Sequence, residues 1–219
     1  MFAKALPANL SASDVVKKYV SVSGGEANWR KVTDITMMMT TEMQGMSINI
    51  NSVRKAPNKV MVDVNASGQT FQKTVFDGEK GYMSQMGQNK DMEADKINEM
   101  KAEDITGDLQ FLSAGYKIEL KGIEKVDDED AYQIEVTTPL GKKMMEFYSV
   151  ATGLKVKSEE TEKTPRGDMT QTSYYKDYKE ATMGLKFPYT IKRIAGPQVI
   201  DMKVKSIEIN AGISDDMFK

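Results

Sequence analysis

The chain of 219 residues contains no cysteine and no histidine. Without cysteine it can form no disulfide, no thiolate nucleophile and no cysteine-based metal site. Without histidine it lacks the most common general base and the most common neutral metal ligand. Serine–histidine triads and HExxH zinc motifs are therefore excluded. We expect no metal, no cofactor and no catalytic residue, although a carboxylate pair for sugar hydrolysis has no local motif and stays open.

The chain also lacks an excess of charge and a long apolar run. Its 30 basic and 32 acidic residues give a formal net charge of −2, without the basic excess of a nucleic-acid-binding protein. No apolar run is long enough to span a bilayer. Residues 1–13 contain no apolar signal-peptide core, which is also the expectation for the mature start of an exported protein or a domain of a longer chain.

Methionine is abundant where the sequence alternates with period two. Residues 34–50 read DITMMMTTEMQGMSINI, with five methionines among seventeen residues. Met37, Met39 and Met43 share one parity, and polar residues dominate the other. The alternation resumes after Gly45, which predicts a β-hairpin with one apolar face.

Similar alternation recurs through most of the chain, with turn signals at the spacing typical of a β-sandwich or barrel. A change of parity near Ser206 predicts a β-bulge. The pattern predicts a mainly β fold in a single domain, residues 1–219. We expect a single curved antiparallel half-barrel of about eleven strands, closed by an N-terminal helix and an inserted helix.

Two segments have helical signals. Ser11 or Ser13 is expected to cap an N-terminal helix that ends at residues 23–25. Residues 89–112 place Ile97 and Met100 at near-helical spacing and are predicted to form an inserted lid helix. We expect Asp91 to cap this helix and Gly107 to stop or kink it.

The apolar parity of the strands predicts either ordinary core or the lining of an apolar ligand site, because methionine adapts to variable shapes. The predicted ligand-binding residues are Met37, Met39, Met43, Met46, Ile48, Ile50, Val60, Val62, Val64, Phe71 and Val75 on strands, with Ile97 and Met100 from the lid.

The acidic run of residues 127–130 is a second candidate site. Carboxylate oxygens suit a hard cation such as calcium. The run lacks the pattern of an EF-hand, however, and it falls where a hairpin turn is predicted. A solvated turn is the interpretation that we prefer.

Two stretches carry a resemblance to a known family: SVRKAPNKVMVDV (52–64) and VFDGEKGYM (75–83). They resemble the LolA-like outer-membrane lipoprotein-sorting family. The matching residues are Lys55, Pro57, Asn58, Asp77, Gly78 and Tyr82, and residues 147–160, 177–192 and 209–219 continue the likeness. The resemblance implies an incomplete β-barrel closed by helices around a cavity for acyl chains, in the periplasm or cell envelope.

One departure bears on function. In the lipoprotein carrier an arginine stands before the Pro-Asn pair and helps to latch the lid, whereas this chain has Ala56. We therefore expect a carrier of lipid or another apolar ligand rather than a lipoprotein shuttle with the usual gating. Similar domains occur at the C-terminal side of some bacterial insulinase-type zinc peptidases. An accessory domain of a larger polypeptide is thus the alternative.

Overall fold

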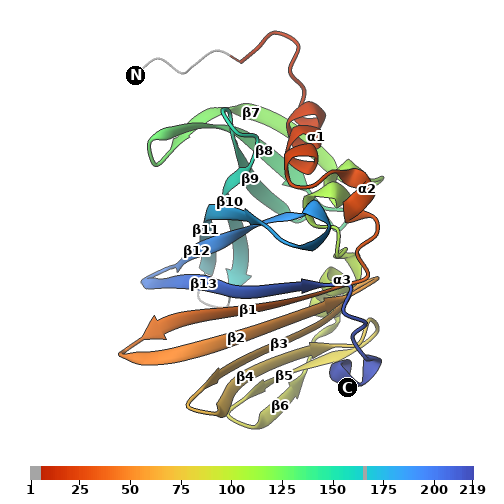
Figure 1. Ribbon diagram of the computed structural model, residues 1–219, viewed down its shortest axis with the longest axis vertical. Coiled ribbons are helices and arrows are strands. Elements are labelled where there is room, and N and C mark those ends of the chain that lie inside the picture. The colour runs from red at the N-terminus through yellow and green to blue at the C-terminus, as the bar shows by residue number, and fades with distance from the viewer. Residues whose placement is uncertain (1–5, 165–166) are drawn as a thin grey trace. The chain divides into compact units, whose positions relative to one another are not determined.

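The computed structural model describes residues 6–164 and 167–219 (Figure 1). The chain divides into two compact units. Unit 1 comprises residues 1–29 and 108–199, and unit 2 comprises residues 30–107 and 200–219. The described residues contain thirteen strands assigned to one antiparallel sheet. The predicted mainly β, antiparallel fold is confirmed, with thirteen strands in place of about eleven.

Unit 2 is a meander of hairpins with one helix. Its strands follow the order β6-β5-β4-β3-β2-β1-β13. Its elements are β1 (Asp34–Met43), β2 (Met46–Lys55), β3 (Lys59–Ala66), β4 (Gln69–Phe76), β5 (Gly81–Gln85), β6 (Gln88–Asp91), α3 (Ala94–Ala102), β13 (Gln198–Ile209) and the 3₁₀ turn η3 (Asp215–Phe218).

Unit 1 combines a second meander, in the order β12-β11-β10-β9-β8-β7, with the N-terminal helices. Its elements are α1 (Ala12–Val22), α2 (Glu26–Trp29), η1 (Gly107–Leu112), β7 (Lys117–Val126), β8 (Glu129–Thr137), β9 (Lys143–Ser149), β10 (Lys155–Thr164), β11 (Gly167–Glu180), η2 (Thr182–Gly184) and β12 (Lys186–Ala195). None of the helices in the described residues is long and apolar enough to cross a membrane.

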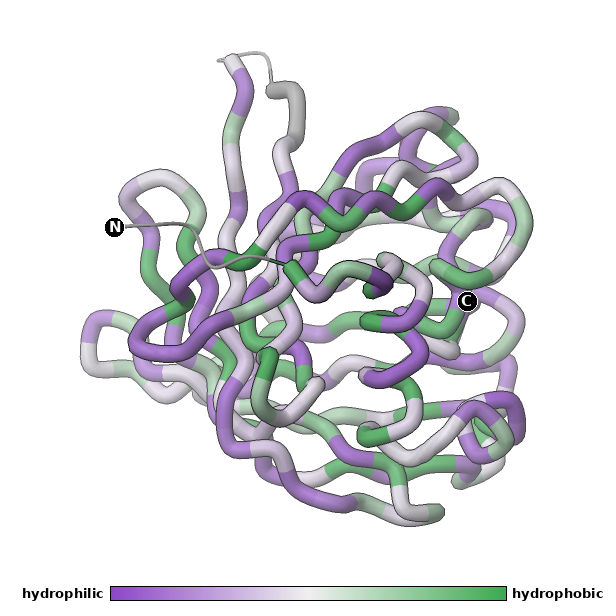
Figure 2. Tube along the Cα trace, turned by 90° about the horizontal axis from the view of Figure 1, so that it is seen from above, coloured by the Kyte–Doolittle hydropathy of each residue, from purple (hydrophilic) through white to green (hydrophobic). Residues whose placement is uncertain are grey.

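Several local predictions are confirmed. Ser11 caps α1 in a reciprocal capping box with Asp14, and the helix ends at Val22, followed by Ser23 as its C-cap. The register of β1 and β13 shifts between Met38 and Met39, opposite Ser206, where a bulge was predicted. Hydrophobic and hydrophilic residues alternate along the strands (Figure 2), as expected of sheet faces in different environments.

The inserted segment differs from its prediction in extent. Residues 88–91 form the short edge strand β6, whose side chains are all exposed. Alternation cannot reveal such a strand, because all four of its residues are polar. Helix α3 therefore begins later than predicted, after Glu93 rather than Asp91, and ends at Ala102, before Gly107.

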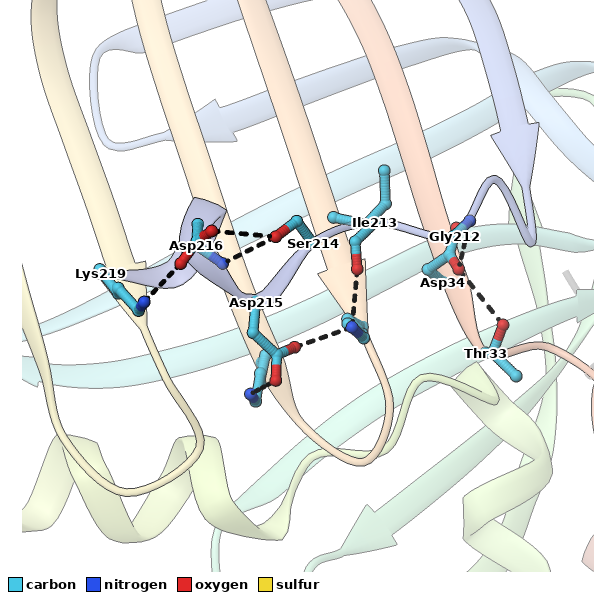
Figure 3. Close-up of polar contacts among 10 residues, drawn as sticks. Thr33, Asp34, Gly212, Ile213, Ser214, Asp215, Asp216 and Lys219 are labelled. Atoms are coloured by element: carbon cyan, nitrogen blue, oxygen red, sulfur yellow. Dashed lines mark hydrogen bonds and ion pairs between the residues drawn. The ribbon is translucent and has the colours of Figure 1, made fainter.

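The C-terminal segment of unit 2 crosses the sheet on one face (Figure 3). The buried Asp34 carboxylate accepts hydrogen bonds from the backbone N–H groups of Ala211 (2.7 Å) and Gly212 (3.2 Å). Farther along, Phe218 is buried in a cluster with Val53, Met61 and Val75. The chain's own tail thereby covers part of this face.

Candidate functional site

The register of unit 2 brings most of the predicted ligand-binding residues onto one face of the sheet. Residues paired across antiparallel strands project to the same side. Met39 pairs with Ile50, and Ile50 with Val64. We call this surface the apolar face; its predicted members are Met37, Met39, Met43, Met46, Ile48, Ile50, Val60, Val62 and Val64.

Helix α3 packs against one end of the apolar face. Met100 is buried in a cluster with Val60 and Phe76, and Ile97 packs against this cluster. The two helix residues predicted to face the lining therefore do so. They follow the three-residue spacing that places side chains on one side of a helix.

Away from α3 several members of the apolar face are only partly covered. Met39, Ile48 and Ile50 are half-buried. At the far end, the cross-strand pair Met43 and Met46 is 42% and 48% exposed. Thr41 and Ala66, which both pair with Ile48, are buried, so exposure on this side of the sheet is confined to particular side chains. The exposed and half-buried members offer a visiting molecule an apolar surface built of flexible side chains.

Val75 does not extend the apolar face as predicted. The register of β3 and β4 slips by one residue between Val64 and Asn65. A one-residue slip reverses which parity faces which side. Val75 consequently pairs with Met61 and packs in the buried cluster of the opposite face, so its predicted placement is wrong. Phe71 falls at the slip and has no pairing partner on β3.

Phe76 and Met92 were missed by the sequence interpretation. Phe76 is fully buried and pairs with Val60. Met92, just before α3, joins the same cluster. Only the pairing register reveals that Phe76 belongs to this face. Because of the slip, Phe76 rather than Val75 lies opposite Val60.

Three polar contacts hold the C-terminal half of α3. The Arg54 guanidinium lies 3.2 Å from the Glu103 carboxylate, directly after the helix. Lys101 pairs with Glu79 at 2.5 Å, and the Asn58 amide donates to the Lys101 carbonyl at 3.4 Å. Arg54 therefore contacts the helical segment from a position two residues before Ala56.

Lys55 projects to the other face of the sheet, where it binds the C-terminal segment. Its ammonium donates to the Ile213 carbonyl at 2.6 Å and lies 2.7 Å from the Asp215 carboxylate. Lys59 also pairs with Asp215, at 2.9 Å. Hydrogen bonds from both lysines lower the pKa of Asp215 to about 2. As neighbours in a strand, Arg54 and Lys55 thus hold two different segments, α3 and the tail.

A cleft of about 710 Å³ in unit 2 opens beside α3. Its lining combines the apolar side chains of Val75, Tyr82, Met92, Ile97 and Phe218 with four charged residues, Asp77, Lys80, Asp91 and Lys219. The volume lies in the range of ~300–1,000 Å³ that is typical of small-molecule sites. Met92 and Ile97 connect this cleft with the covered end of the apolar face.

Unit 1 contains a different kind of site, a nearly buried cluster of charged groups. The Lys155 ammonium lies 2.6 Å from Asp108 and 2.9 Å from Glu146. The Tyr148 hydroxyl donates to Asp108 at 2.8 Å, and the Lys155 ammonium lies 6.0 Å from the centre of the Tyr19 ring. Sequence reasoning missed this cluster, although Glu146 stands among residues of a strand that is otherwise mostly apolar.

The electrostatics of the cluster favour a structural role over nucleophilic chemistry. Burial alone would lower the pKa of Lys155, but Asp108 and Glu146 outweigh it and raise that pKa well above its usual value. The amine is therefore protonated and is not a nucleophile. Burial also raises the pKa of Tyr19 and Tyr148 well above their usual value, which keeps both phenols neutral.

The acidic run of residues 127–130 lies where it was expected. Asp127 and Asp128 form the turn between β7 and β8. Asp127 pairs with Lys176 at 2.6 Å, and Glu129 accepts a hydrogen bond from Ser149. Among the residues that the structure describes, no group of three or more acidic side chains is arranged to hold a metal ion.

Solved structures share this fold over nearly the whole chain. A LolA superfamily protein from Nitrosomonas europaea superposes with a TM-score of 0.61 at 14% identity, covering 96% of this chain and 98% of its own. A DUF1329 family protein from Desulfovibrio piger gives 0.58 at 14% identity, covering 95% and 97%. A domain described as an outer-membrane lipoprotein-sorting protein, from Vibrio parahaemolyticus, gives 0.58 at 11% identity, covering 95% and 96%.

These comparisons show that the chain has a LolA-like fold. They confirm the fold predicted from the resemblance of residues 52–64 and 75–83. No protein-family model matches the sequence, and no curated protein matches it significantly. At 11–14% identity, the likeness to the solved structures is one of fold.

Proposed function

We propose that the chain is a non-catalytic carrier that binds an apolar or acyl-chain ligand in the bacterial cell envelope. The observation that carries the proposal is the apolar face of unit 2, which is half-buried along its strands and covered by α3 at one end. The fold shared with a LolA superfamily protein and a lipoprotein-sorting domain supports the same role and location.

The apolar face can supply enough free energy for such a ligand. Burial of apolar surface contributes ~25 cal/mol per Å², so covering about 300 Å² contributes roughly 7 kcal/mol. The entropy lost on association offsets part of this gain. An acyl chain laid along Met39, Ile48 and Ile50 would bury surface on both partners, with its end beside Ile97 and Met92 in the cleft.

Helix α3 is suited to act as the lid, because its attachment is weak. The residue at its N-cap, Glu93, makes no side-chain capping hydrogen bond. The ion pair of Arg54 with Glu103 is 43% and 47% exposed, and such pairs contribute about 0–1 kcal/mol. Opening the helix therefore costs mainly the exposure of Met100 and Ile97.

The test is a double substitution in the middle of the face, Met39→Asp with Ile48→Asp. Two carboxylates there would have to be buried against an apolar chain, which is strongly unfavourable. We expect uptake of palmitate, followed by native mass spectrometry, to fall at least tenfold. Far-UV circular dichroism measures whether the strands are retained.

Met38→Asp is the matched control. Met38 is next to Met39 in the chain but projects to the opposite face of the sheet, where it is already exposed. We expect it to bind palmitate like the unchanged chain. Undiminished uptake by the folded double variant would contradict the proposed lining. An unchanged chain that takes up no acyl ligand would instead favour the accessory domain of a larger polypeptide.

A further inference from the structure

The two ends of the unit 2 sheet differ sharply in charge. Three hairpin turns lie at one end, at residues 43–46, 66–69 and 85–88 (Figure 1). These twelve residues include no charged side chain. The turns at the opposite end, residues 55–59 and 76–81, contain two lysines and a cluster of Asp, Glu and Lys respectively. We call the uncharged end the methionine tip.

The methionine tip exposes several large apolar side chains to solvent. Met86 is 71% exposed and stands in the turn between β5 and β6. Met83 on β5, two residues before this turn, is 44% exposed and pairs across the hairpin with Lys90. The remaining positions of the three turns are mainly glutamine, serine and glycine. Exposed apolar side chains gathered on one part of a surface mark an interaction site more often than scattered ones do.

The tip is continuous with the apolar face. The pair Met43 and Met46 closes the β1–β2 hairpin, and the next pairs along the same face are Thr41 with Ile48 and Met39 with Ile50. No charged side chain interrupts this path. An acyl chain could therefore pass from the tip onto the face without crossing a charged group.

We propose that the methionine tip docks on the surface of a lipid bilayer and is the end through which acyl chains enter and leave. This inference rests on the proposed carrier function and adds its partner. Flexible methionine side chains suit a fluid apolar boundary, and glutamine amides can hydrogen-bond to headgroups. Because the three turns contain no charged side chain, and the nearest charges, Glu42 and Lys90, lie on the strands behind them, the turns match an electrically neutral lipid surface better than a charged protein partner.

The experiment uses vesicles of phosphatidylcholine containing a fluorescent fatty acid. The variant is Met83→Gln with Met86→Gln, which removes the exposed apolar groups of β5 and of the turn that follows it, without touching the predicted ligand-binding residues. We expect co-sedimentation with vesicles and transfer of the fatty acid from them to fall at least fivefold. Uptake of the same fatty acid dispersed in buffer stays within twofold.

A second variant adds charge in place of removing apolar groups. Gln44 and Ser67 occupy turn positions with φ of 51°, which aspartate tolerates better than most residues. Gln44→Asp with Ser67→Asp should weaken co-sedimentation with phosphatidylcholine and weaken it further when anionic lipid is added. The control is Met169→Gln with Met217→Gln, which removes exposed methionines outside the tip.

The outcomes separate the two proposals. Co-sedimentation that is unaffected in both tip variants, or that falls steeply with salt in the unchanged chain, overturns the docking surface. Loss in the control as great as in the tip variants also overturns it. Failure of the unchanged chain to bind dispersed fatty acid overturns the carrier function instead, while co-sedimentation still reports on the tip.

Discussion

Unit 1 and unit 2 use their interiors in different ways. Unit 1 places the ammonium of Lys155 between two carboxylates and surrounds it with aromatic rings. Unit 2 has an apolar face that is buried under α3 but keeps Met39, Ile48 and Ile50 half-buried elsewhere. A network of buried charges holds only in one geometry, because each group that loses its partner is left desolvated. An adaptable apolar surface has no such requirement, and this suits it to a ligand.

The largest expected effect comes from removing the cation of unit 1. Lys155→Met leaves Asp108 and Glu146 without their shared partner. Breaking a buried pair in this way costs about 3–5 kcal/mol, and we expect a loss of that size in the free energy of unfolding by urea.

The control for this substitution is Lys176→Met. Lys176 pairs with Asp127, but the two side chains are 60% and 55% exposed, so we expect a change below about 1 kcal/mol. Equal losses of unfolding free energy in the two variants would show that the buried cluster of unit 1 stabilises the fold no more than an exposed ion pair does.

The next effect is a dependence of stability on pH. Burial raises the pKa of Glu146 from its usual 4.5 to about 7, so the folded chain retains a proton that the unfolded chain has lost. The stabilisation is complete below pH 4.5 and is lost as pH rises through 7, by up to about 3 kcal/mol. Thermal unfolding of the Glu146→Gln variant should not show this decline. A decline of the same size in that variant would assign it to another group.

The smallest effect is expected for Ile48→Ala, and its comparison with Ile134→Ala tests whether the apolar face is ordinary core. Ile48 on this face is half-buried, whereas Ile134 in unit 1 is fully buried. We expect Ile134→Ala to cost about 4 kcal/mol and Ile48→Ala only about 1 kcal/mol, because little packing is lost at a partly exposed site. Similar costs, measured by urea unfolding, would indicate that the apolar face is plain core.

Alternation in the sequence sufficed to predict the strands and the shared face of β1, β2 and β3. It failed at β4, because a single register slip between Val64 and Asn65 reverses which side chains of β4 project to each face. No residue type at that position indicates the slip. It also failed at β6, whose four polar residues have no apolar parity. Register and edge strands depend on pairing, which local pattern does not specify.

The charged cluster of unit 1 could not be assembled from the sequence. Asp108, Glu146 and Lys155 come from η1, β9 and β10, and charged residues are usually exposed. Glu146 alone gave a hint, because it shares parity with Met144 and Tyr148. Its partners became evident only once the strands were paired and η1 was placed beside them.

The contacts that attach α3 respond differently to dissolved salt. The ion pairs of Arg54 with Glu103 and of Lys101 with Glu79 lie in solvent. Dissolved salt screens such pairs, and the Debye length falls from about 10 Å at 0.1 M to about 3 Å at 1 M. The buried contacts of Met100 are not weakened in this way. Higher ionic strength is thus expected to remove the small contribution of the ion pairs and to leave α3 held by its apolar contacts alone.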